Sequence, residues 1–143
     1  MKTAFLPILA LIAVVSLGLP AQAENQSQVK QLLETGACAG CNLVGADLTG
    51  AHLIGADLRD ANLQGAILVK ANLEGADLTG ANLKDSNLTE AFVTNATLDQ
   101  ANLTGVNLTN ARMINASTVG ATLTNIEISG AQVFGSGINI GGD

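Results

Sequence analysis

Cys38 and Cys41 are the residues of this chain best suited to chemistry, because they form its only Cys-x-x-Cys motif. A thioredoxin-like redox motif needs a βαβ context, and no such pattern surrounds the pair. A zinc site needs about four ligands, and His52 is the only further His or Cys in the chain. If the chain is exported, these residues predict a structural disulfide between Cys38 and Cys41, with no metal bound.

The other polar residues do not form a recognisable catalytic group. His52 is the only histidine and has no obvious nucleophilic or acidic partner. The carboxylates of the central region are spread singly, as on a solvated surface: Asp47, Asp57, Asp77, Asp85 and Asp99. We therefore expect no catalysis and no cofactor.

The composition argues against nucleic-acid binding. The formal net charge is −6, from 6 basic and 12 acidic residues, so the chain would be repelled by a phosphate backbone. With 3 Phe and neither Trp nor Tyr, it has no aromatic platform on which bases could stack. Because 48% of the residues are hydrophobic, a disordered chain is also excluded.

The first residues have the pattern of an export signal. Lys2 precedes an apolar run over residues 4–19, and Ala21-Gln22-Ala23 offers the small residues that signal peptidase requires. The run has 16 residues, which is short for a membrane span of about 20. We expect residues 1–23 to be a signal peptide cleaved after Ala23, with no membrane association afterwards.

A five-residue repeat dominates the rest of the sequence. Residues 41–140 divide without a gap into 20 pentapeptides, whose first position is Ala in 15 and whose third is Leu in 14. On an α-helix this spacing rotates successive leucines by about 140°, and on a straight strand it sends them to alternate sides. Either element would leave half of the leucines in water. The repeat therefore predicts a solenoid that bends every five residues and keeps Ala and Leu inside.

Substitutions within the repeat indicate how many units form one coil. Val93, Met113 and Val133 replace Leu at intervals of 20 residues. Four units per coil would stack these three residues on one face of a square cross-section. The 20 units would then make about five coils, followed by a C-terminal tail at residues 141–143.

Units such as Ala56-Asp57-Leu58-Arg59-Asp60 and Ala81-Asn82-Leu83-Lys84-Asp85 resemble the pentapeptide repeat family, whose motif is A-(D/N)-L-x-x. The resemblance implies an all-β fold, a right-handed quadrilateral parallel β-helix with four units per coil. The lead-in from Leu32 to Leu43, which contains both cysteines, is similar to that of exported or lumenal cyanobacterial members. The resemblance thus implies a location in the periplasm or thylakoid lumen, or outside the cell.

Residues 24–40 are expected to form a short N-terminal capping helix and the cysteine-containing lead-in. Ser27 is suited to the N-cap of this helix and Gly36 to its end. Val29, Leu32 and Leu33 would form one stripe that covers the first coil. No helix is predicted at the C-terminal end, so an end-to-end homodimer is possible there.

One predicted face differs from the other three. It carries the units His52-Leu53-Ile54, Asn72-Leu73-Glu74, Phe92-Val93-Thr94, Arg112-Met113-Ile114 and Gln132-Val133-Phe134. Phe92 and Phe134 are the only aromatic residues after the predicted signal. An apolar patch with Arg and His beside it predicts a partner-binding face, formed by His52, Ile54, Phe92, Arg112, Ile114 and Phe134. Relaxed selection, or cover by the C-terminal tail, would explain the same pattern.

These observations favour a non-catalytic exported solenoid, a rigid structural or protein–protein interaction module whose protein partner is unknown. The resemblance implies an alternative, a DNA mimic that regulates a DNA-binding enzyme such as gyrase. The net charge of −6 permits this alternative, but export would separate the chain from a cytosolic enzyme. Ice or carbohydrate binding through threonines such as Thr89 and Thr109 is disfavoured, because Val69 interrupts the array.

Overall fold

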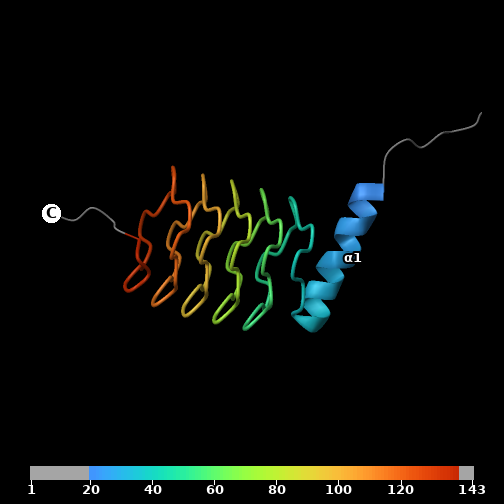
Figure 1. Cartoon of the computed structure of the whole chain (residues 1–143), viewed down its shortest axis with the longest axis horizontal. Coiled ribbons are helices and arrows are strands. Elements are labelled where there is room, and N and C mark those ends of the chain that lie inside the picture. The colour runs from blue at the N-terminus through green and yellow to red at the C-terminus, as the bar shows by residue number, and fades with distance from the viewer. Residues whose placement is uncertain (1–19, 139–143) are drawn as a thin grey trace, which may run out of the picture.

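The computed structural model describes the backbone of residues 20–138 and the side chains of residues 25–138. In this part of the chain one helix, α1 (Pro20–Thr35), lies against one end of a stack of coils (Figure 1). The predicted apolar run and the predicted tail fall outside the described residues, as do the last two residues of the predicted repeat array. Within the described part, no helix is both long and apolar enough to cross a bilayer.

The coils are joined by a regular parallel ladder. Every bridge joins second-position residues 20 apart, from Ala37–Asp57 at the N-terminal end to Arg112–Gln132 at the C-terminal end. The prediction of four pentapeptides per coil is therefore confirmed. Each bridge is isolated and no longer strand forms in the described residues, because the chain turns again every five residues.

Each unit from residue 56 to residue 110 makes the same set of backbone hydrogen bonds. In the unit that begins at residue 71, the Asn72 amide donates to the Ala51 carbonyl of the preceding coil at 2.9 Å, and the Leu73 amide donates to Phe92 of the next coil at 2.7 Å. The Ala76 amide then donates to the Leu73 carbonyl at 3.0 Å and closes the corner. Gly75 has φ +66° at this corner, as the third residue of a type II turn requires.

The core consists of the first and third positions, as the repeat predicts. The third-position side chains from Leu43 to Met113 are at most 2% exposed. In the last described coil Val133 and Ile138 are still buried, at 7% and 8% exposed. Five other first- and third-position residues there are only half-buried, because no further described coil packs on them: Ala121, Leu123, Ile126, Ile128 and Ala131.

The start of helix α1 differs from the prediction. The helix begins at Pro20, so Ser27 lies inside it and is not its N-cap. Residues 21–26 are mostly Ala, Gln and Glu, which are strong helix formers, and proline is favoured in the first turn. The predicted end is confirmed, since Gly36 has φ +68° and its amide donates to the Leu32 carbonyl at 2.8 Å.

The predicted apolar stripe on α1 is correct for two of its three residues. Leu32 is 1% exposed and belongs to the core, and Val29 packs partly buried against it. Leu33 is instead 52% exposed. Asn25 and Gln28 lie at i−7 and i−4 from Leu32 and also contact the first coil, so the buried face passes through Leu32 and turns Leu33 outward.

Candidate interaction face

The structure places all six predicted partner-binding residues on one face of the solenoid. Bridges connect its second-position residues in one column: His52, Asn72, Phe92, Arg112 and Gln132. Hydrogen bonds from the neighbouring corner amides align its fourth-position residues in a second column: Ile54, Glu74, Thr94, Ile114 and Phe134. We call these two columns the His52 face.

The His52 face carries the largest share of exposed apolar surface on the coils. Phe134 is 81% exposed, Ile54 63% and Phe92 40%. Among residues 25–138, each of the other three faces has one exposed large apolar side chain, namely Val44, Ile67 or Val119. Near the C-terminal end of the face, Ile114, Val133, Phe134 and Ile138 line an open hollow of about 590 Å³.

Charged groups on this face have no ion-pair partner among the described side chains. Arg112 instead lies over the ring of Phe92, with its guanidinium carbon 5.8 Å from the ring centroid. Glu74 is exposed on the coil between His52 and Phe92, and no ion pair in residues 25–138 includes Glu74 or Arg112. Within the described residues, the face therefore offers one carboxylate and one cation that are not ion-paired.

On a different face, Asp57 is held by Arg59. The Arg59 Nε and Nη2 atoms donate to the two carboxylate oxygens at 2.8 and 2.7 Å. These bonds, with the backbone amide and positive charge of Arg59, lower the pKa of Asp57 to about 2. The hydroxyls and amides of Thr49 and Ser129 likewise lower the pKa of Asp47 and Glu127. These carboxylates are therefore poor proton acceptors at neutral pH.

Arg59→Ala is expected to raise the pKa of Asp57 from about 2 toward its ordinary value of 3.8. Because the folded pKa lies below the unfolded one, the contribution of this pair to stability is complete above about pH 4 and is lost as the pH falls through about 2. Side-chain NMR titration measures the midpoint. Lys84→Ala, which removes a cation from another face, should leave it unchanged, and an unshifted Asp57 in the Arg59 variant would contradict the assigned cause.

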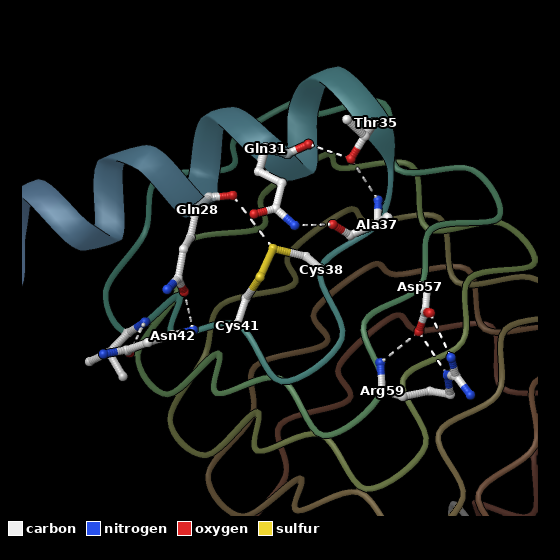
Figure 2. Close-up of a disulfide and its surroundings, with 10 residues drawn as sticks. Gln28, Gln31, Thr35, Ala37, Cys38, Cys41, Asn42, Asp57 and Arg59 are labelled. Atoms are coloured by element: carbon white, nitrogen blue, oxygen red, sulfur yellow. Dashed lines mark hydrogen bonds and ion pairs between the residues drawn. A yellow bond between two sulfur atoms is a disulfide. The ribbon is translucent and has the colours of Figure 1, made fainter.

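The two cysteines lie at the corner of the first coil, beneath α1 (Figure 2). Their sulfur atoms are 2.04 Å apart, which is the distance of a disulfide. Cys38 is 1% exposed and Cys41 is 8% exposed, so both occupy inward positions of the repeat. The Cys38 Sγ atom also lies 3.5 Å from the Gln28 carbonyl oxygen of α1. Across the part of the chain with described side chains, no cluster of three or more metal-binding residues occurs.

Polar side chains of α1 bond to the exposed edge of the first coil. Gln31 Nε2 donates to the Ala37 carbonyl at 2.8 Å, and the Ala37 amide donates to Thr35 Oγ1 at 3.1 Å. The Asn42 amide donates to Gln28 Oε1 (Figure 2). In later coils the equivalent groups bond to the preceding coil, so these side chains replace part of a missing coil.

Asn25 adds a second bond to the unit that contains Asn42, since its Nδ2 atom donates to the Val44 carbonyl at 2.7 Å. Asn25, Gln28 and Gln31 are three residues apart and thus share one side of the helix. Sequence reasoning missed these residues, because it considered only the apolar stripe. The i, i+3, i+6 spacing of the amide side chains was the signal that could have identified them.

The pentapeptide repeats family matches this chain with 8 copies of the repeat, over residues 41–80, 56–94 and 94–130. A pentapeptide repeat protein from the Arabidopsis thaliana thylakoid lumen is 32% identical; the match covers 68% of this chain and 62% of that one, with a TM-score of 0.47. A pentapeptide repeat protein of the cyanobacterium Cyanothece is 26% identical. That match covers 75% of this chain and 93% of the Cyanothece protein, with a TM-score of 0.37.

The chain is also 26% identical to HetL of the cyanobacterium Nostoc, a pentapeptide repeat protein involved in heterocyst differentiation regulation. That match covers 70% of this chain and 62% of HetL, with a TM-score of 0.39. This chain thus spans less than two thirds of the Arabidopsis and Nostoc proteins. No curated protein sequence matches it. Because the family matches residues 41–130, which are more than half of the sequence, this chain belongs to the pentapeptide repeat family.

Proposed function

We propose that this chain is an exported, non-catalytic solenoid that acts as a rigid protein-interaction module and makes its contacts through the His52 face. Pentapeptide repeat proteins are generally non-enzymatic structural or interaction modules, and they fold as right-handed β-helices. For this chain we infer the same hand, a square cross-section and a capping role for α1.

The observation that carries this proposal is the exposure of Phe134, Ile54 and Phe92 on one face of a regular ladder. Backbone hydrogen bonds to both neighbouring coils fix the position of Phe92, and bonds to one neighbouring coil fix those of Ile54 and Phe134. A preformed surface loses little conformational entropy when a partner binds. Exposed aromatic and arginine side chains are also the residues that most often dominate binding energy.

Export is supported by the signal-like residues 1–23 and by the pairing of Cys38 with Cys41. We propose that these cysteines are oxidised in a periplasm or thylakoid lumen. The intact mass of the protein from its native host tests this proposal. A mass that begins at Glu24 and lacks two hydrogens would support it, whereas a full-length mass with free thiols would favour the cytosolic DNA mimic.

The contact face is tested with a photocrosslinking amino acid in place of Phe134. Val119 is the matched control, because it is also strongly exposed, at 72%, and also lies near the C-terminal end of the stack, but on another face. We expect a defined crosslinked species from position 134 and none from position 119. Equal crosslinking at both positions, or none at either, would contradict the proposal.

The side chains responsible are tested in the same assay with the double variant Phe92→Ala and Arg112→Ala, which should weaken the crosslink at position 134. The control is the double variant Ile67→Ala and Lys84→Ala. Ile67 is an apolar residue that is 40% exposed, as Phe92 is, and Lys84 is a cation, as Arg112 is, but both lie on other faces. Both variants should unfold at the same temperature as the parent, since all four side chains lie outside the core.

A further inference from the structure

We propose that the partner of the His52 face is a second copy of this chain, docked face to face with the two solenoid axes antiparallel. This inference rests on the proposed role of that face as a contact surface and names its occupant. The face has five levels, one per coil: His52 with Ile54, Asn72 with Glu74, Phe92 with Thr94, Arg112 with Ile114, and Gln132 with Phe134.

Two copies of one flat face can pair through a two-fold axis that runs either across the solenoids or along them. An axis across them reverses the order of levels, so the first level meets the fifth and the second meets the fourth. The third level then lies on the axis and meets itself. The second-position column of one copy then faces the second-position column of the other. The fourth-position columns likewise face each other.

The charges match in this antiparallel arrangement. Glu74 on the second level approaches Arg112 on the fourth level of the other copy, and the symmetry forms this pair twice. The two residues stand in neighbouring columns, separated by two residues along the strand, or about 7 Å, a distance that an arginine side chain can cross. Neither residue has an ion pair among the described side chains of its own chain.

The apolar side chains match as well. Ile54 faces Phe134 of the other copy, and these are the two most exposed apolar side chains of the face, at 63% and 81%. Phe92 faces Phe92 of the other copy at the axis, where aromatic rings can stack with an offset. Arg112 already lies over Phe92 of its own chain, so its guanidinium is held beside this central contact.

An axis along the solenoids produces poorer contacts. Each level would then meet its own copy with the two columns exchanged. Glu74 would face Asn72, Arg112 would face Ile114, and Phe134 would face Gln132. Glu74 and Arg112 then stay two levels, or about 10 Å, apart, and no ion pair forms. Both arrangements place one charged side chain opposite Ile114, Glu74 in the antiparallel one and Arg112 here, but only the antiparallel one brings the opposite charges into neighbouring columns. The antiparallel arrangement is therefore the one that the surface favours.

The charged corner beside the face does not oppose this pairing. Glu90 lies close to the axis and would approach Glu90 of the other copy. Each Glu90, however, has Lys70 of its own chain within 3.6 Å. The corner on the other side of the face carries the uncharged Asn95 at the same level.

The size of the face predicts a weak dimer. Five levels spaced by about 4.8 Å give a length of about 24 Å, and a face of this length that is only one pentapeptide wide buries less than the about 1,200–2,000 Å² of a standard interface. This area is at the low end for specific complexes. We therefore expect association in the micromolar to submillimolar range, reversible on dilution.

Sedimentation velocity of the full exported chain over that concentration range tests the proposal. Glu74→Arg and Arg112→Glu should each weaken the dimer at least about tenfold, because each places like charges opposite one another. The double variant with both changes should restore the affinity of the parent. A parent that remains monomeric throughout, or a double variant as weak as the single ones, would overturn the proposal.

A cysteine at the two-fold axis provides a second test. Thr94→Cys should form a disulfide-linked dimer on mild oxidation, because Thr94 faces itself across the axis. Thr104→Cys is the matched control, since it is also a half-buried fourth-position threonine but lies on another face. An end-to-end homodimer would leave Thr94→Cys unlinked and would not respond to the charge exchange, and that result would exclude the side-by-side arrangement.

The failure of this inference is distinguishable from that of the proposed function. If the chain stays monomeric and the photocrosslink at position 134 has the mass of a different protein, the second copy is excluded and the contact face stands. If position 134 gives no crosslink above the position 119 control, both proposals fail.

Discussion

Leu73→Ala is expected to lower the free energy of unfolding by about 3–4 kcal/mol. Leu73 is fully buried, and in the same core column Leu53 of the preceding coil is 1% exposed and Val93 of the next coil is 0% exposed. Backbone ladders on both sides fix the spacing of these coils, so neighbouring side chains cannot move in to fill the space. Urea unfolding followed by circular dichroism measures the loss.

Leu123→Ala makes the same chemical change at the same position of the repeat, but in the last described coil. Leu123 is only partly buried, so the removed atoms lose less burial and the space left is open to water. We expect a loss of less than about 2 kcal/mol. Equal losses at positions 73 and 123 would contradict this explanation. They would show that the stability lost at Leu73 does not depend on having a coil packed on each side of it.

The repeat itself was sufficient to predict most of this architecture. A period of five with Ala and Leu at fixed places has one arrangement that hides every leucine, and the structure has those side chains inside. The replacement of Leu by Val93, Met113 and Val133 every 20 residues indicated four units per coil, in agreement with the family resemblance, and the bridges follow that interval. The same interval grouped the residues of the His52 face.

Contacts made outside the repeat could not be predicted in this way. The start of α1 depends on helix propensity across a predicted cleavage site, and Ser27 resembles an N-cap although the helix continues through it. The position of Arg112 over Phe92 depends on side-chain conformation, which the period does not specify. The roles of Asn25 and Gln28 depend on which backbone groups the first coil leaves unpaired, and these are known only once the ladder is built.

Replacing Asn25, Gln28 and Gln31 together with Ala is expected to release α1 from the first coil while leaving the helix itself intact. Each residue makes one hydrogen bond to the edge of that coil. Three such bonds at about 1 kcal/mol each correspond to an increase on the order of 100-fold in the opening equilibrium. Alanine is the best helix former, so the substitutions do not weaken the helix.

Two measurements report this opening. The Asn42 amide should exchange with solvent about 100-fold faster, because Gln28 no longer accepts its hydrogen bond. The Cys38–Cys41 pair should also be reduced faster by a small dithiol, because Cys38 is 1% exposed and lies directly beneath α1. Exchange of the Leu73 amide, which bonds to Phe92 within the stack, should not change.

A control on the opposite side of α1 separates docking from helix stability. Lys30→Ala together with Leu33→Ala changes two exposed residues of the same helix to the same amino acid. If docking through the amide side chains protects the first coil, this control should leave both rates at their parent values. Equal acceleration in the control would show that protection depends on the exposed side of the helix. No acceleration in the triple variant would show that burial of Leu32, which is 1% exposed, holds α1 in place by itself.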